Sequence, residues 1–215
     1  GAPENIFMGK IAADGSWAAD FDGTMDALQS AIANRQSAII IGTAFSFVHL
    51  LDFLAEKKIR LRLPPGSRVM ETGGYKNRSR SMPKAELHAL ITELLGVPEA
   101  NIVCEYGMSE LSSQAYDGVA GDEWRVARNG LSRRSTPVTR HFYFPAWARV
   151  QVVSPETGRE AGEGETGLIR IFDLANVFSV AAIQTEDLGI RRGDGFELVG
   201  RAQLAEPRGC SLMTA

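Results

Sequence analysis

Hydrophobic and polar positions follow helical and strand-like periods in turn through about residue 115. The first amphipathic stretch predicts a helix that runs through Ala33, with Asp22 or Thr24 as its cap. A short β-rich run from Ser37 to Ile41 follows, and Gly42 is expected to break it. The order is therefore helix, strand and turn.

A second helix is predicted from about Phe45 to Lys57. Its apolar face repeats at three-residue steps and includes Val48, Leu51 and Leu54. Pro64, Pro65 and Gly66 then predict a turn before a strand from Arg68 to Glu71.

The third helix is expected to open at Ser81 and Pro83 and to close at Gly96 and Pro98. A strand from Asn101 to Glu105 follows it. Helices and strands that alternate in this way favour βα units and a mostly parallel sheet, so the fold class of this part is α/β.

After about residue 116 the period shortens, and turn residues at Ser154–Gly158 and Gly193–Gly195 separate short segments, as in hairpins. Strands are predicted at Ala148–Val153, Gly167–Asp173 and Phe196–Val199. We therefore expect a small antiparallel β-barrel-like subdomain beside the α/β part.

The predicted organisation has four parts. Residues 1–117 form the α/β part, and residues 118–140 form a long polar loop that carries five arginines. Residues 141–200 form the antiparallel β subdomain, and residues 201–215 form a hinge and C-terminal tail.

Composition excludes several classes of protein. The 215 residues are 44% hydrophobic and 23% charged, with a formal net charge of -3 and no basic stripe, which disfavours nucleic acid as a partner. Cys104 and Cys210 lie far apart, and the three histidines show no metal-ligand spacing, so we expect neither a zinc site nor a disulfide scaffold. Polar residues interrupt the most apolar stretch, Ala38–Leu54, so no membrane span is expected.

The N-terminal residues show neither a basic segment nor an apolar signal core, which favours a cytoplasmic location. The first residue is Gly1 rather than methionine, which suggests that the chain is a fragment.

Four polar clusters accompany the predicted strands, where open α/β sheets bind ligands. Glu71–Tyr75 contains two glycines that let the backbone approach a flat ligand, although a Gly-Gly pair is also common in plain turns. Tyr106–Glu110 combines an aromatic ring, a flexible glycine, a hydroxyl and a carboxylate. These groups suit adenine stacking, phosphate approach and Mg²⁺ ligation, but they equally suit a packed ring followed by a helix cap.

The third cluster, Thr185–Gly189, offers a carboxylate that could accept both hydroxyls of a ribose, unless it is an ordinary acidic turn. The fourth, Gly200–Arg201, offers a fork-shaped cation that suits phosphate or a developing charge, unless Arg201 is simply a surface arginine.

In this order, Gly-Gly, Tyr-Gly-x-Ser-Glu, Thr-x-Asp-x-Gly and Gly-Arg resemble the adenylate-forming superfamily of acyl-CoA synthetases and luciferases. Within it, the runs Ser67–Lys76 and Glu105–Gln114 resemble the acyl-protein synthetase family, whose namesake is the LuxE component of the bacterial bioluminescence fatty-acid reductase complex. The resemblance covers roughly residues 35 to 212.

The resemblance implies a role for each matching residue. Gly73 and Gly74 would line the adenine and ribose pocket, Tyr106 would stack on adenine, and Asp187 would hold the ribose hydroxyls. Gly107 would also contribute to nucleotide binding.

On the phosphate side, Ser109 would touch the α-phosphate, Glu110 would ligate Mg²⁺, and Arg201 would follow the β subdomain at the hinge. Position 186 is Glu where many superfamily members have Gly, so this loop departs from the usual pattern. The implied cofactors are ATP and Mg²⁺.

Family members activate a fatty acid as acyl-AMP and pass the acyl group to a cysteine near the C-terminus. Cys210 is the candidate, because Arg208 and a flexible tail could favour an exposed thiolate, although an inert packed thiol is the alternative. Cys104 lies inside a predicted strand and is expected to be a small core residue.

The chain contains no Gly/Ser/Thr-rich phosphate loop, so we expect these residues alone to be inactive. Family members are longer on the N-terminal side, where that loop lies, so the resemblance implies that the chain is a C-terminal portion. Three hypotheses remain. The chain could belong to an acyl-protein synthetase or related acid:thiol ligase acting on a fatty or other carboxylic acid. It could instead be a non-catalytic nucleotide-binding module. Finally, it could dock an acyl reductase through the arginine-rich segment Arg125–Arg140.

Overall fold

A computed structural model describes residues 5–11, 13, 15, 17–75, 79–117 and 140–202. These residues fall into two compact units, one that extends to Ile102 and one that starts at Val103. The predicted loop at residues 118–140 lies outside the described residues except for Arg140, and so does the tail beyond Ala202.

The first unit contains a short antiparallel pair, β1 (Gly9–Ile11) and β2 (Trp17–Ala19), followed by helix α1 (Phe21–Ala33). The predicted cap at Asp22 or Thr24 was wrong. Asp20 is the N-cap, because its side chain accepts a hydrogen bond from the N–H of Gly23 while the Thr24 hydroxyl donates back to its carbonyl.

Strand β3 (Ile39–Thr43) continues through Gly42 instead of breaking there. It pairs in parallel with β4 (Arg68–Thr72), and Gly42 lies opposite Glu71 in this register. Ladder hydrogen bonds therefore hold the glycine in an extended conformation despite its weak strand propensity.

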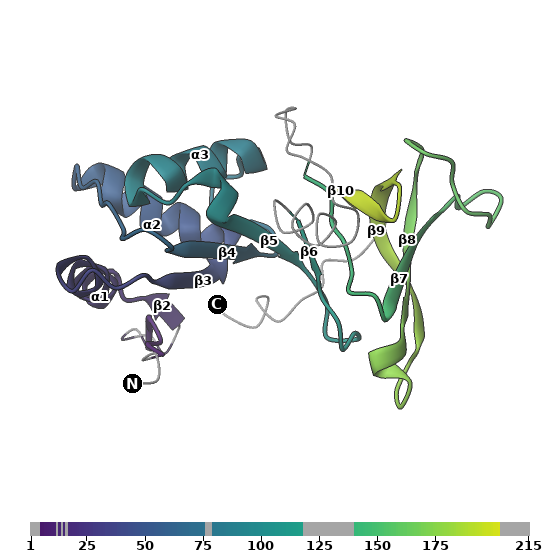
Figure 1. Ribbon diagram of the computed structural model, residues 1–215, viewed down its shortest axis with the longest axis horizontal. Coiled ribbons are helices and arrows are strands. Elements are labelled where there is room, and N and C mark those ends of the chain that lie inside the picture. The colour runs from purple at the N-terminus through teal and green to yellow at the C-terminus, as the bar shows by residue number, and fades with distance from the viewer. Residues whose placement is uncertain are drawn as a thin grey trace. The chain divides into compact units, whose positions relative to one another are not determined.

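Helix α2 (Ala44–Glu56) begins at Thr43, whose side chain caps the N–H of Ser46. Helix α3 (Lys84–Leu95) begins after Pro83, which provides no side-chain cap, and ends at the left-handed Gly96. The two helices lie side by side over the β3–β4 pair (Figure 1). The predicted apolar face of α2 is buried in their shared core, together with Leu87, Ile91 and Leu95 of α3.

A short 3₁₀ turn (Glu99–Asn101) leads into β5 (Ile102–Tyr106), which carries the chain from the first unit into the second. In the second unit β5 pairs antiparallel with the short β6 (Ala115–Tyr116), so that Glu105 lies opposite Tyr116.

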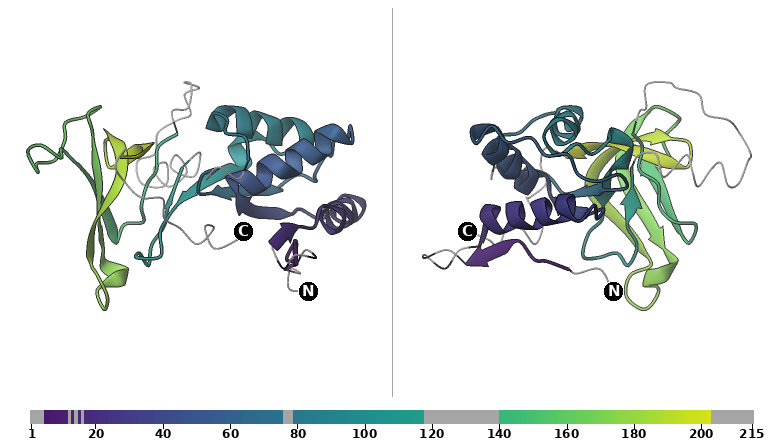
Figure 2. Two further views of the ribbon diagram at one scale, coloured as in Figure 1. Left: turned by 180° about the vertical axis from the view of Figure 1, so that it is seen from behind. Right: turned by 60° about the vertical axis from the view of Figure 1, so that its left-hand side comes forward.

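The remainder of the second unit is a curled antiparallel sheet in the order β10-β9-β8-β7 (Figure 2). Its strands are β7 (Ala148–Val153), β8 (Thr166–Asp173), β9 (Ala182–Arg192) and β10 (Gly195–Arg201). A 3₁₀ turn at Leu174–Asn176 follows β8. The sheet and the helical first unit confirm the predicted α/β class with a small antiparallel β subdomain.

Strand β9 was not predicted, and it contains the cluster Thr185–Gly189 that we expected at a strand end. From Ala182 to Asp187 exposed and half-buried positions alternate, but apolar and polar side chains do not follow that alternation, which hides the period of two. Pairing on both sides, with β8 and with β10, holds it as a strand.

Candidate functional site

Tyr106 is the last residue of β5 and belongs to the core of the second unit. Its ring packs at 5.2 Å from Phe196 and 5.9 Å from Phe142, measured between ring centroids. Only 7% of the residue is exposed. Adenine could therefore stack on Tyr106 only through the small accessible part of the ring or after one phenylalanine moves.

The hydroxyl of Tyr106 donates a hydrogen bond of 2.8 Å to Oδ2 of Asp187. These residues are far apart in sequence, and the contact joins the second and third predicted clusters. Burial, followed by the negative charge of Asp187 and this hydrogen bond, raises the pKa of Tyr106. The phenol is therefore held neutral and serves as a permanent donor to the carboxylate.

Asp187 also lies opposite Arg201 in the β9–β10 register. Nε of Arg201 is 3.4 Å from the second carboxylate oxygen, Oδ1, and the Asp187 side chain is 18% exposed. The Asp187 carboxylate thus accepts a hydrogen bond from the neutral Tyr106 hydroxyl and pairs with the Arg201 cation on the neighbouring strand, while part of it still faces solvent.

Thr185 fixes the backbone beside this carboxylate. Its hydroxyl donates to the carbonyl of Ile169 on β8 and accepts the N–H of Asp187, at 2.9 Å and 3.1 Å. The Thr-x-Asp spacing therefore has a structural cause, because the threonine bridges two strands and orients the aspartate two residues later.

Ser109 and Glu110 are both exposed on the loop that follows β5, and so is Gly107. The Ser109 hydroxyl donates to Oε2 of Glu110 at 3.2 Å. An exposed carboxylate beside a hydroxyl offers hard oxygen ligands, and Mg²⁺ usually combines one or two carboxylates with phosphate oxygens and water. This donor set is compatible with Mg²⁺ bound mainly through phosphate oxygens and water.

Gly73 and Gly74 lie in the first unit, after β4, and both are exposed. Gly73 has a φ of 67°, and no neighbouring atom would contact a Cβ at either position. The need for glycine at residue 73 thus comes from its left-handed backbone.

Glu71 begins this cluster but is only 1% exposed, so it cannot meet a ligand in the present arrangement. Its Oε1 is 3.2 Å from Nζ of Lys84 and 3.4 Å from Nε2 of the buried His88, both on α3. The carboxylate ties the end of β4 to the helix beside it.

The two cysteines differ in what the structure describes. Cys104 is buried in β5, as expected for a small core residue. Cys210 lies outside the described residues, as does the arginine-rich docking segment except for Arg140, which pairs with the buried Asp117 at 3.3 Å.

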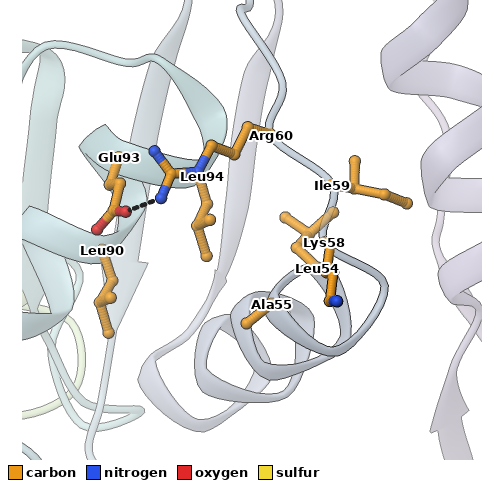
Figure 3. Close-up of a pocket in the computed structure, with 8 residues that line it drawn as sticks. All are labelled: Leu54, Ala55, Lys58, Ile59, Arg60, Leu90, Glu93 and Leu94. Carbon is orange, nitrogen blue, oxygen red and sulfur yellow. Dashed lines mark hydrogen bonds and ion pairs between the residues drawn. The ribbon is translucent and has the colours of Figure 1, made fainter.

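A pocket of about 290 Å³ lies in the first unit near the C-terminal ends of α2 and α3 (Figure 3). Its lining residues are Leu54, Ala55, Lys58, Ile59, Arg60, Leu90, Glu93 and Leu94. Arg60 and Glu93 form an ion pair at 2.6 Å, and the other lining residues, except Lys58, are apolar. None of these residues belongs to a predicted cluster.

Among the described residues, no helix combines the length and apolar character needed to cross a membrane.

Comparison with known proteins gives the family. The model of the acyl-protein synthetase family, LuxE, matches residues 8–215, which is nearly the whole chain. The chain belongs to the LuxE acyl-protein synthetase family. This confirms the resemblance drawn from the runs Ser67–Lys76 and Glu105–Gln114.

A curated LuxE relative is the long-chain-fatty-acid–luciferin-component ligase of Aliivibrio fischeri. It is 24% identical over 208 residues, which cover 91% of this chain and 50% of the relative. The chain thus spans about half the length of the curated relative that it matches.

Solved structures of similar fold are adenylate-forming enzymes. They include the McyG A-PCP complex with phenylalanyl-adenylate, at a TM-score of 0.55 and 18% identity, covering 85% of this chain and 33% of that one. ATP-bound MatB from Rhodopseudomonas palustris gives 0.52 and 17%, covering 85% and 33%. The luciferase-like enzyme of the mealworm Zophobas morio gives 0.51 and 16%, covering 85% and 41%. These likenesses show that this LuxE-family chain has an adenylate-forming fold.

The sequence analysis missed two polar residues that contact the loop carrying Ser109 and Glu110. Asp173 is the last residue of β8, and Asn176 lies in the turn after it. A signal was present for Asp173, because Gly167, Ile169 and Ile171 precede it at steps of two on the buried face. A carboxylate at an inward position indicates a buried polar role.

Proposed function

We propose that this chain provides the nucleotide-binding part of an enzyme that activates a fatty acid with ATP as acyl-AMP and transfers the acyl group to a cysteine. The observation that carries the proposal is the Asp187 carboxylate, held by the Tyr106 hydroxyl on one oxygen and by Arg201 on the other. Membership of the LuxE family supports the reaction class.

In this proposal Asp187 accepts the ribose hydroxyls, and Tyr106 lies against adenine. A partly exposed carboxylate next to an aromatic ring offers a charged acceptor and an apolar contact, which a nucleoside requires together.

Ser109 and Glu110 serve the phosphates. Ser109 donates to the α-phosphate, and Glu110 ligates Mg²⁺, which neutralises charge on the triphosphate when bound. The substrate carboxylate oxygen attacks the α-phosphorus of ATP, the bond to pyrophosphate breaks, and acyl-AMP forms. Arg201 supplies a fixed cation beside this region.

The second step that we propose uses Cys210. Its thiolate attacks the acyl carbon, the bond to the AMP oxygen breaks, and a thioester to the protein remains. A fatty acid is the proposed substrate because the relative from Aliivibrio fischeri is named for a long-chain fatty acid. An acyl reductase is the proposed recipient of the acyl group.

Mass spectrometry of the natural full-length protein after incubation with ATP, Mg²⁺ and a fatty acid tests this proposal. We expect an acyl adduct on Cys210 that hydroxylamine removes. Cys210→Ser should diminish the adduct or convert it into an oxygen ester, whereas Cys104→Ser should leave it in place because Cys104 is buried.

The opposite result is equally clear. If the protein releases free acyl-CoA on addition of CoA while Cys210 stays unmodified, then the enzyme is an acid:thiol ligase. The hypothesis that the acyl group is transferred to Cys210 is then wrong.

A further inference from the structure

Asp173 occupies a position where the alternation of β8 predicts an apolar side chain. It continues the buried face of β8 after Ile169 and Ile171, and it is 0% exposed. An unpaired carboxylate at such a position would be strongly destabilising, so its partners explain why it is there.

Those partners come mainly from the segment that follows Glu110. Oδ2 of Asp173 accepts the backbone N–H groups of Ser112 and Ser113 at 3.0 Å and 2.9 Å. Oδ1 accepts the Ser113 hydroxyl at 2.9 Å and the N–H of Ala175 at 3.0 Å. Four donors saturate the carboxylate, which can then be buried as an acceptor.

Asn176 provides a second attachment. Its Nδ2 donates to the carbonyls of Glu110 and Val180 at 2.7 Å and 3.0 Å, and its Oδ1 accepts the Ser112 hydroxyl at 3.0 Å. The amide orientation follows from these partners, since the nitrogen faces carbonyl groups and the oxygen faces a hydroxyl.

Together these bonds hold the loop Gly107–Ser113 from both ends. Tyr106 is anchored in the aromatic core at the start of the loop, and Asp173 binds its end. Asn176 binds the backbone carbonyl of Glu110 itself. The side chains of Ser109 and Glu110 remain exposed, so the backbone is fixed while the chemical groups are free to meet a ligand.

We infer that Asp173 and Asn176 are positioning residues, which hold Ser109 and Glu110 in place for the Mg²⁺-bound triphosphate. The inference rests on the proposed nucleotide site. It assigns to the end of β8 a role in the phosphate half of the reaction, distinct from the nucleoside half held by Asp187. Groups that orient a metal ligand commonly change metal affinity or activity 10- to 100-fold when they are removed.

The main test is Asn176→Ala in the natural full-length protein. We expect the Mg²⁺ concentration that gives half-maximal ATP–pyrophosphate exchange to rise, and the exchange rate to fall, by about 10- to 100-fold. Calorimetry with adenosine, which lacks the α-phosphate that Ser109 would contact, should give a Kd within about twofold of the wild-type value, because the contacts of Tyr106 and Asp187 are untouched. Gln184→Ala is the matched control. It removes an exposed amide that accepts from Arg170 on the same sheet, and it should change neither readout.

Hydrogen exchange without metal or nucleotide gives a readout independent of activity. In Asp173→Ala, the amide N–H groups of Ser112 and Ser113 should lose protection, because the side chain that accepts them is removed. Circular dichroism checks that this variant folds. If it does not fold, Asn176→Ala decides alone.

Two results would overturn the inference. One is unchanged exchange and Mg²⁺ dependence in Asn176→Ala; the other is an equal loss of adenosine binding and exchange, which indicates general damage to the subdomain. A wild-type protein that fails to bind AMP would instead reject the proposed function, so the two failures are distinguishable.

Discussion

At the scale of single residues, side chains from three of the predicted clusters come together. Tyr106 and Arg201 both contact the Asp187 carboxylate, although the three residues come from different parts of the chain. The strand pattern of β8 signals a buried role for Asp173, but it does not identify the partners of Asp173 and Asn176 on the Ser109 loop, which lie 60 and 66 residues earlier. Short motifs therefore identify reactive side chains near a strand end, whereas the residues that hold those side chains in place depend on the fold.

The neutral phenol of Tyr106 gives a prediction about alkaline stability. Its pKa in the folded protein lies above the ordinary value of 10.0, because burial and Asp187 oppose ionisation. Above pH 10.0 the unfolded chain therefore loses a proton that the folded protein retains. The contribution of Tyr106 to the free energy of unfolding is complete below pH 10.0 and declines as the pH rises further.

Urea unfolding of wild type and Tyr106→Phe at pH 7 to 11.5 tests this. At neutral pH the variant should be less stable by about 0.5 to 1.5 kcal/mol, the value of one lost hydrogen bond. Above pH 10.0 the wild-type stability should fall more steeply than that of the variant. Parallel curves across the whole range would show that Tyr106 does not resist ionisation.

At the scale of elements, helices and the strands beside them were largely predictable because their apolar periods are strong. Strand β7 was predicted with the bounds that the structure has, and α2 within one residue at each end. Strand β9 was missed, since Thr185, Glu186, Asp187 and Gly189 resemble turn residues when taken alone. Hydrogen bonds with β8 and β10 hold it as a strand, although its composition does not favour one.

The bulge in β10 sets the geometry of the candidate site. The register shifts between Leu198 and Gly200, Gly200 adopts a φ of 141°, and Arg201 then falls opposite Asp187. We expect Gly200→Ala to strain this backbone by about 1 to 2 kcal/mol and to weaken AMP binding by moving Arg201.

Gly158→Ala is the matched control, because Gly158 also has a positive φ, 67°, and also has open space around it. It lies in the turn after β7, so the variant should lose similar stability by urea unfolding and keep its AMP affinity. Equal AMP affinities for the two variants would show that the bulge does not position Arg201.

At the scale of the whole molecule, the order of motifs along the chain carried more information than any one of them. Gly-Gly or Gly-Arg alone describes many proteins, but the four clusters in order resembled the adenylate-forming superfamily. Within it, the runs Ser67–Lys76 and Glu105–Gln114 predicted the LuxE family, and the family match over residues 8–215 confirms it. The acyl chain was not predictable, because the residues of an acyl pocket would be scattered in sequence and carry no local motif.

The central claim is that this chain carries a nucleoside-binding site built around Asp187. Isothermal titration of AMP into the natural full-length protein tests it most directly, with Asp187→Asn and the exposed turn variant Asp194→Asn measured in parallel. We predict a wild-type Kd of about 0.1 to 1 mM. Asp194→Asn should bind equally well, and Asp187→Asn should bind about 10- to 150-fold more weakly through loss of a charged acceptor. No binding by the wild type, or equal binding by all three proteins, would contradict the account.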